Sequence, residues 1–249
     1  MRTLGSLLIS SVFVFLPACG ESASARKSTM VFAAASLTAS FQDLATAFEA
    51  DHPDAKIDLH FAGTPQLVLQ VREGAPVDVF ASADETNMQR VVEMGKTLAA
   101  PVVFARNRLT IVTVTGNPKG IRSLADLARE DVRVVLCGPE VPAGRYARQA
   151  LDKAGVRVES LSDEPSVKAV VSKVQLAEVD AGIVYVTDAT SAKGQVDAVA
   201  IRDEHNVVGT YPIVSLAAGD DPDGSATFIA FVRSDAGQAI LRRYGFASP

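Results

Sequence analysis

The 249-residue sequence contains no tryptophan, only two cysteines and three histidines, and 6% aromatic residues. None of the histidines, His52, His60 and His205, has a nucleophile or a second metal ligand at a useful local spacing, so we interpret them as structural or surface residues. Walker, GxGxxG, CxxC and HExxH motifs are all missing. These absences leave most enzyme classes without support, although a Ser–His–Asp triad assembles in space and needs no local motif.

The sequence also lacks a basic cluster. It has 24 Lys and Arg against 29 Asp and Glu, a formal net charge of −5, and therefore no footprint for nucleic acid. Net charge describes the whole surface, so a site can still be locally positive. A hydrophobic content of 48% supports a real core, and the 17 glycines and scarce aromatics are typical of α/β proteins with one large or two modest domains.

The N-terminus has the pattern of an export signal. The apolar run from Leu4 to Pro17 follows Arg2 and is too short to span a bilayer as a mature helix. It ends in LPACG, which resembles a bacterial lipobox with Cys19 as the lipidated residue; cleavage after Ala25 is the alternative. We predict a lipoprotein signal peptide over 1–18, a flexible tether over 19–28, and a periplasmic or cell-surface location with a lipid anchor on Cys19.

Cys137, the second cysteine, ends the apolar run 132–137. We interpret it as a small buried hydrophobic residue. A disulfide with Cys19 is the alternative in an oxidising compartment, although a lipidated Cys19 would be unavailable for it.

A strand that leads directly into a helix is predicted over 30–49. The apolar run 30–35 indicates a buried strand, and five apolar residues then follow a helical period. These five are Leu37, Phe41, Leu44, Ala45 and Phe48. Ser36 lies at the joint, where its hydroxyl and backbone N–H either cap the helix or contribute to an anion site.

The same order of strand, small residues and helix recurs along the chain. Further strands are predicted over 57–61, 78–82, 109–114, 132–137, 181–186, 196–201 and 211–216. Helices are predicted over 65–73 with Thr64 at the N-cap, from Asp84 to Gly95, from Ser123, over 143–154, from Ser166, and over 224–232 and 235–244. The polar stretch 106–108 indicates a break before a second lobe. This alternation favours two α/β lobes with mainly parallel sheets, and a ligand cleft at the carboxyl ends of the strands.

Four predicted helix starts carry small uncharged donors: Ser36, Thr64, Ala143-Gly144 and Ser166-Val167. A dehydrated tetrahedral dianion only accepts hydrogen bonds, so fixed N–H and O–H donors can satisfy it if several act together against the cost of removing water. A protonated oxyanion would direct an O–H at a donor and lose affinity. These residues therefore indicate an anion-binding cleft.

Several segments together resemble the periplasmic molybdate-binding proteins of ABC importers. They are VFAAASLT at 31–38, GAPVDVFASAD at 74–84, VPAGRYA at 141–147, GIVYVTDA at 182–189 and RYGF at 243–246, in order over the mature chain. The resemblance implies a two-lobed type II periplasmic-binding-protein fold, each lobe being a mainly parallel sheet flanked by helices. Lobe I would comprise 29–106 plus 206–249, and lobe II 107–205.

The resemblance also implies the ligand cage. Ser36 and Thr64 would bind through hydroxyl and N–H, Ala143 and Val167 through backbone N–H, and Tyr185 through its phenol. The alternatives are a helix cap for Thr64, core contacts for Ala143 and Val167, and a buried aromatic with its hydroxyl on a carbonyl for Tyr185. The family usually has a Ser-rich turn where this chain has GTP at 63–65, and the proline removes one N–H donor.

The implied function is capture of molybdate or tungstate and delivery to a membrane permease, by a monomer with no cofactor, no directly coordinated metal and no nucleic-acid partner. It implies no enzyme activity. A binding protein for sulfate or phosphate is one alternative, and a hydrolase with Ser36 or Thr64 as nucleophile is another. Arg145, beside the turn at 143–144, is interpreted as a solvated side chain.

Overall fold

The structure is a computed structural model, and it describes residues 27–249. The predicted signal peptide, Cys19 and most of the tether lie outside the described residues. Within that range no helix combines the length and the apolar character needed to cross a membrane. In chain order the elements are β1 (Lys27–Ala34), η1 (Ala35–Leu37), α1 (Thr38–Asp51), β2 (Ala55–Ala62), α2 (Thr64–Arg72), β3 (Val79–Ala81), α3 (Glu85–Glu93), β4 (Val102–Val114), η2 (Leu124–Ala128), β5 (Val134–Cys137), α4 (Pro142–Lys153), β6 (Asp163–Glu164), α5 (Val167–Gln175), β7 (Ala181–Tyr185), α6 (Val186–Ser191), β8 (Val196–Ala200), β9 (Val208–Ser215), α7 (Pro222–Arg233) and α8 (Asp235–Arg243).

The nine strands in the described chain form one mixed sheet. Their order is β2-β1-β3-β9-β4-β7-β5-β6, and β8 also pairs with β4. The pairs β1–β2, β1–β3, β5–β6 and β5–β7 are parallel, whereas β3–β9, β4–β7, β4–β8 and β4–β9 are antiparallel. The prediction of mainly parallel sheets was therefore wrong for half of the pairs, because β4 and β9 run against their neighbours.

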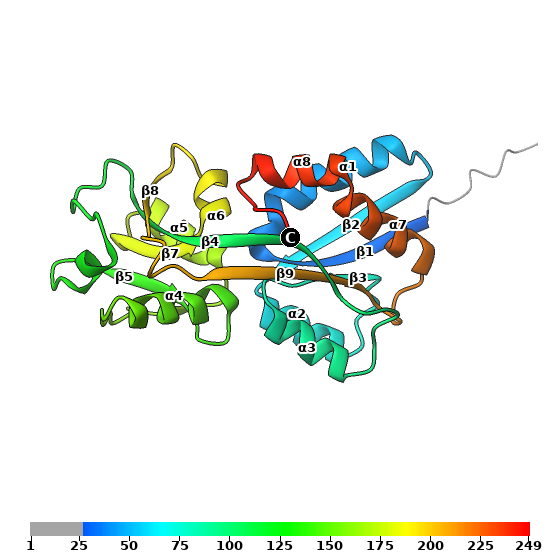
Figure 1. The fold of residues 1–249 in the computed structure, drawn as a ribbon, viewed down its shortest axis with the longest axis horizontal. Coiled ribbons are helices and arrows are strands. Elements are labelled where there is room, and N and C mark those ends of the chain that lie inside the picture. Colours follow the sequence, from blue (N-terminus) through cyan, green and yellow to red (C-terminus); the bar gives the residue numbers. More distant parts are fainter. Residues whose placement is uncertain (1–26) are drawn as a thin grey trace, which may run out of the picture.

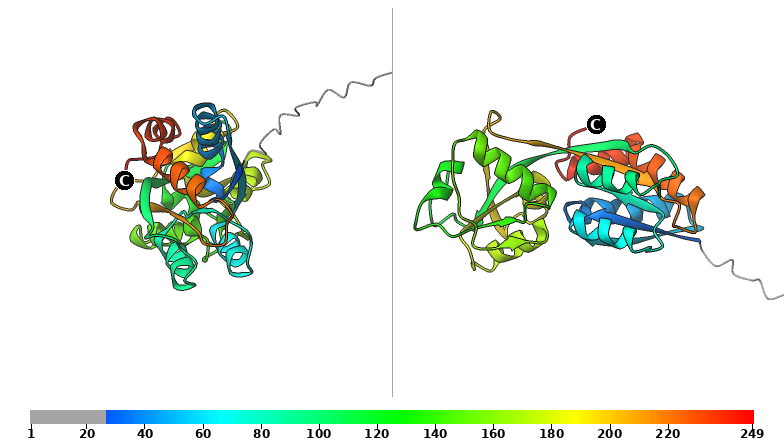
Figure 2. Two further views of the ribbon diagram at one scale, coloured as in Figure 1. Left: turned by 90° about the vertical axis from the view of Figure 1, so that its right-hand side faces the viewer. Right: turned by 90° about the horizontal axis from the view of Figure 1, so that it is seen from below.

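The elements gather into two groups that β4 and β9 connect (Figure 1). We call β1–β3, η1, α1–α3, α7 and α8 the first group, and β5–β8, η2 and α4–α6 the second group. The same separation is visible from below (Figure 2, right). β4 pairs with β9 at one end and with β7 and β8 at the other, so this strand is shared by both groups.

The polar stretch 106–108 does not interrupt β4. Its three residues pair with Thr210, Gly209 and Val208 of β9. Arg106 and Arg108 are exposed while Asn107 is buried, which is the alternation of a strand with one wet face. The predicted break was wrong because the buried position of this alternation holds a polar residue.

The first strand-to-helix unit is as the sequence predicted. All five residues of the expected apolar stripe are buried, and Phe41, Phe48 and Phe228 are almost completely so. Phe41 meets Phe104 of β4 and Phe228 of α7 edge to face, with ring centroids 5.7 and 6.1 Å apart. Aromatic pairs of this geometry add to the free energy of burial. This packing holds the start of α1 against β4, and Ser36 of the candidate site lies just before that start.

Two of the predicted helix caps are confirmed, the cap predicted at Thr64 is wrong, and the cap that was one alternative for Ser36 is not formed. The side chains of Asp84 and Ser166 accept hydrogen bonds from the N–H three residues on, at 2.9 and 3.4 Å. Ser36 lies within the short helix η1 and caps nothing with its side chain, and Gly63, not Thr64, occupies the N-cap of α2. The hydroxyls at these two joints are consequently not used as side-chain caps.

Cys137 is free and completely buried, as predicted for a small hydrophobic residue. Burial raises the pKa of its thiol far above the usual range. The thiol is consequently unreactive in the folded protein.

Asp188 holds the end of β7 from within the core. One carboxylate oxygen, Oδ2, accepts a hydrogen bond from the backbone N–H of Tyr185 at 3.2 Å. The other oxygen, Oδ1, is buried and has no partner among the described residues. Burial raises the pKa of this carboxyl from 3.8 to about 7, against smaller opposing effects of Lys168 and of the Tyr185 N–H. Near pH 6 the side chain is therefore mostly neutral.

Replacing Asp188 with Asn should change how stability depends on pH. A carboxyl whose pKa is raised by folding stabilises the native state fully below pH 3.8, and this contribution is lost as the pH rises to about 7. Asn does not titrate, so the variant does not lose this contribution. The difference in the free energy of unfolding, Asp188→Asn minus wild type, should therefore increase by about 1 kcal/mol per pH unit between pH 3.8 and about 7.

Urea denaturation at pH 4.5, 6 and 7.5 measures the difference. Glu159→Gln, at an exposed position, serves as the matched control and should keep the wild-type profile. A constant difference between Asp188→Asn and wild type at the three pH values would contradict the assignment.

Candidate functional site

All five predicted ligand residues line one small pocket where the two groups meet. The pocket has about 210 Å³ of empty space, counting the part open to solvent. Its lining consists of Ala34, Ala35, Ser36, Gly63, Thr64, Ala83, Val141, Pro142, Ala143, Ser166, Val167 and Tyr185. No charged side chain is among these residues. The structure thus brings Ser36 and Tyr185, 149 residues apart in the sequence, into one neutral pocket.

Helix starts supply most of this lining. η1, α2, α4 and α5 begin at or beside Ser36, Thr64, Ala143 and Val167. The first N–H groups of a helix have no partner within the helix and carry partial positive charge. Because all four starts are buried, their N–H donors are held away from bulk water. A group that only accepts hydrogen bonds is the natural partner for such an arrangement.

Tyr185 contributes an unpaired hydroxyl. Its side chain is 1% exposed at the end of β7, and its phenol oxygen has no hydrogen-bond partner among the described residues. Burial, with Tyr211 beside it, raises the pKa of this phenol well above its usual value, so the group stays a donor at neutral pH. A buried polar group without a partner costs about 1–3 kcal/mol. The predicted alternative, a hydroxyl bonded to a carbonyl, is not what the structure has.

Behind Ser36 lies a chain of hydrogen bonds that the sequence analysis missed. The Ser36 hydroxyl is 3.0 Å from the phenol oxygen of Tyr211 on β9. The side-chain amide of Asn107 donates to this phenol at 3.4 Å and to the hydroxyl of Thr187 at 2.8 Å. Tyr211 and Asn107 are completely buried. The only local signal was a polar residue at an inward position of β4, and it was interpreted as a break.

The two groups touch closely beside the pocket. A Cβ added to Gly63, at the start of α2, would lie 2.1 Å from the carbonyl oxygen of Pro165, which precedes α5. Real Cβ atoms do not approach this closely, so only glycine permits the contact. The close contact between Gly63 and the Pro165 carbonyl oxygen therefore requires glycine at position 63.

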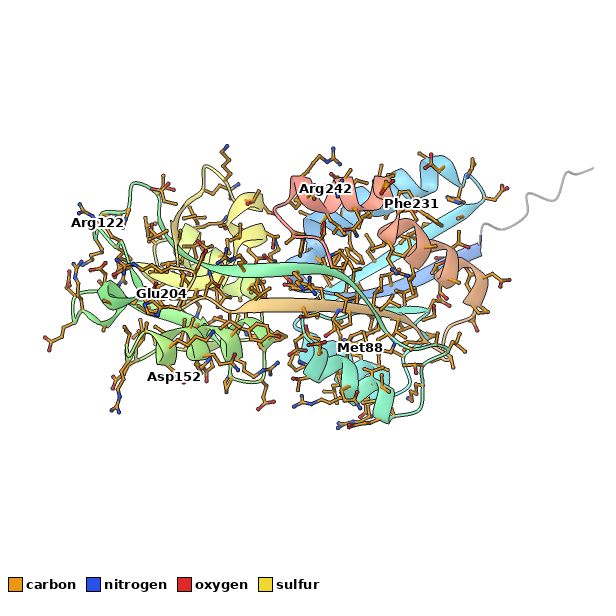
Figure 3. All side chains as sticks on the ribbon, in the orientation of Figure 1. Met88, Arg122, Asp152, Glu204, Phe231 and Arg242 are labelled. Carbon is orange, nitrogen blue, oxygen red and sulfur yellow. The ribbon has the colours of Figure 1, made fainter. Side chains whose placement is uncertain are left out.

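Ion pairs join the same two groups next to residues that line the pocket. Arg145 of α4 bonds the buried carboxylate of Asp84 at the start of α3, and Arg90 of α3 lies 3.2 Å from Glu140. In Figure 3, α4, which carries Asp152, lies in the left-hand half of the molecule and α3, which carries Met88, in the right-hand half. The interpretation of Arg145 as a solvated side chain was wrong, because it pairs with a fully buried acid.

The remaining candidate chemistry lies away from this pocket. His52 stacks on Phe48, the His60 imidazole is 3.1 Å from the Gln70 amide, and His205 lies beside Glu204. Among residues 27–249, no three His, Cys, Asp or Glu side chains are grouped to hold a metal ion. No base lines the pocket beside its hydroxyls, so a hydrolase has no support here.

Residues 29–247 match the protein family described as bacterial extracellular solute-binding protein. The molybdate-binding protein ModA of Mycobacterium tuberculosis strain H37Rv is 39% identical over 261 aligned residues, which cover 100% of both chains.

Two solved structures share the fold. The periplasmic molybdate-binding protein of Azotobacter vinelandii has a TM-score of 0.77 at 18% identity, covering 89% of this chain and 99% of that one. The sulfate-binding protein SubI of M. tuberculosis H37Rv has a TM-score of 0.76 at 19% identity, covering 89% and 86%. The architecture is therefore an α/β periplasmic-binding-protein fold, as the sequence predicted. Proteins of the family that residues 29–247 match bind solutes outside the cytoplasm and are not enzymes. Because both the family match and a 39% identical relative span nearly the whole chain, the chain belongs to the bacterial extracellular solute-binding protein family.

Proposed function

We propose that the protein is the substrate-binding component of an ABC importer, and that it captures molybdate or tungstate and delivers it to a membrane permease. The observation that carries the proposal is the neutral pocket with the unpaired Tyr185 hydroxyl. Full-length similarity to a molybdate-binding protein supports the choice of ligand. The protein would act as a monomer and would hold the anion without any other cofactor.

The proposed ligand contacts are the hydroxyls and N–H groups of Ser36 and Thr64, the N–H groups of Ala143 and Val167, and the Tyr185 phenol. Each can donate, and a tetrahedral dianion has only acceptors to offer. The partial positive charge of several helix starts adds to this attraction without introducing a mobile charged side chain. Oxyanions that carry a proton, such as hydrogen phosphate, would bring one donor too many into the pocket.

We further propose that the two groups are lobes that close on the anion. Lobe I would comprise 29–106 plus 206–249 and lobe II 107–205, with β4 and β9 as the connections. The contacts of Gly63 with Pro165 and of Arg145 with Asp84 support closure, because both join the groups beside the pocket. A ligand that touches both lobes stabilises the closed arrangement by its contacts to each.

Export and anchoring complete the proposal. The apolar N-terminus would be removed after residue 18, and lipid on Cys19 would hold the protein at the membrane surface near its permease. Residues 19–26 would form the tether, because Lys27 and Ser28, which the sequence analysis assigned to it, belong to strand β1. This arrangement keeps the protein within reach of the permease while the cleft remains in solution.

Sulfate is the alternative ligand, because SubI has the same fold at a similar TM-score. The fold alone does not separate the two anions, since both are tetrahedral dianions. The choice rests on the full-length relative, which is a molybdate-binding protein.

Thermal unfolding in the presence of different anions tests the function. Molybdate or tungstate at 100 times its Kd should stabilise the protein by about 2.7 kcal/mol and raise the midpoint accordingly. Sulfate and phosphate at the same concentration should leave the midpoint close to that of the unliganded protein. A midpoint raised by sulfate or phosphate, and unchanged by molybdate and tungstate, would overturn the proposal.

A substitution at Gly63 tests closure. Gly63→Ala places a Cβ against the Pro165 carbonyl, so the lobes would stop short of full contact and molybdate affinity should fall about ten-fold or more in calorimetric titration. Melting without ligand should change little, because an open form avoids the clash.

Gly138→Ala is the matched control, since the nearest atom to its added Cβ is 3.7 Å away. This variant should bind molybdate as wild type does. Wild-type affinity in Gly63→Ala would show that binding does not need this approach.

A further inference from the structure

The amide of Asn107 has a fixed orientation. Its oxygen accepts a hydrogen bond from the backbone N–H of Arg108 at 2.9 Å. The NH₂ side must then face the other way, where it donates to Thr187 and Tyr211. An amide turned by 180° would lose all three bonds. The backbone of β4 therefore determines that Asn107 donates its hydrogen bond to Tyr211 and does not accept one.

The proton of Tyr211 consequently has one destination. The phenol oxygen already accepts from Asn107, and its nearest other partner is the Ser36 hydroxyl at 3.0 Å; the Tyr185 phenol also lies beside it, as a donor toward it. If Ser36 donated to Tyr211, the buried phenol proton would have no acceptor, which is costly. Both groups are satisfied only when Tyr211 donates to Ser36.

Ser36 then has its own proton free. Its oxygen accepts from Tyr211, and its O–H must point elsewhere. Because Ser36 lines the pocket, that direction is available toward a ligand. Burial raises the pKa of the Tyr211 phenol far above its ordinary value, so the phenol keeps its proton at any physiological pH.

We propose that Asn107 and Tyr211 are positioning residues that make Ser36 donate its hydroxyl proton to the ligand. We call the chain of hydrogen bonds from Asn107 through Tyr211 to Ser36 the relay. The relay would make the site selective for oxyanions that carry no proton. The inference rests on the proposed function, because it needs an oxyanion at Ser36. A free serine hydroxyl can rotate and accept from a hydrogen phosphate O–H. A serine that accepts from Tyr211 keeps one lone pair, but its own proton cannot turn back toward Tyr211 and is left for the ligand.

The relay also draws on both groups. Ser36 belongs to the first group, Thr187 to the second, and Tyr211 and Asn107 lie on β9 and β4, the two strands that connect them (Figure 1). The hydroxyl that faces the ligand is thus oriented from the connecting strands themselves. No residue of the relay other than Ser36 lines the pocket.

The test is calorimetric titration of molybdate, with competition by phosphate up to 100 mM at pH 7, on the full mature chain. Tyr211→Phe removes the donor to Ser36 with little change in shape. Molybdate affinity should fall about ten-fold, and the ratio of phosphate to molybdate dissociation constants should fall at least as much, because the serine can now accept.

Asn107→Asp tests the direction of the relay. The aspartate accepts from both neighbours, so the Tyr211 proton would turn toward it and Ser36 would donate backward to Tyr211. The serine lone pair would then face the anion, and molybdate affinity should fall further than in Tyr211→Phe. If Asn107→Asp melts below the assay temperature, the Tyr211→Phe result alone decides.

Tyr244→Phe is the matched control. It removes a phenol that donates to Asp43 at 2.7 Å, outside the relay and the pocket, and both anions should bind as in wild type. Ser36→Ala should weaken molybdate and is the positive control.

The outcomes separate the two proposals. If wild type fails to bind molybdate, the proposed function fails. If wild type binds molybdate and Tyr211→Phe keeps the wild-type ratio of phosphate to molybdate dissociation constants, the relay is wrong even when affinity falls, because a purely structural effect weakens both anions alike.

Discussion

The structure depends on one constraint: buried hydrogen-bond donors must converge on a single point without a charged side chain among them. Helix starts meet this requirement, because their first N–H groups have no internal partner and carry partial positive charge. The chain places four such starts, with a tyrosine hydroxyl that has no partner of its own, around one pocket. For the proposed ligand, many weak donors of fixed geometry replace the water shell that a free anion would keep.

The rest of the fold maintains this convergence. The Phe41 and Phe48 side chains hold α1 in the core, and Asp188 fastens the end of β7 beneath Tyr185. β4 and β9 pair with each other and connect the two groups, and Tyr211 of β9 contacts Ser36 of the pocket lining. The buried acid Asp84 is neutralised by Arg145, which belongs to the opposite group.

The sequence predicted the helix starts and the apolar stripe of α1, because both follow from local periodicity and small residues at strand ends. It predicted the five ligand positions through resemblance to a family, and the structure brings all five to one pocket. It missed Asn107 and Tyr211, whose partners are 80 to 175 residues away. Local patterns carry no information about such pairings. Of the two roles left open for Ser36, the helix cap is wrong, because its hydroxyl pairs with Tyr211 instead.

The central claim is that an oxyanion is held by these neutral donors and by nothing else. A crystal structure of the molybdate complex, with diffraction measured above the molybdenum absorption edge, tests it most directly. The account predicts one strong anomalous peak enclosed by Ser36, Thr64, Ala143, Val167 and Tyr185, with no lysine or arginine in contact. A peak elsewhere in the chain, or one whose oxygens contact a charged side chain, would contradict it.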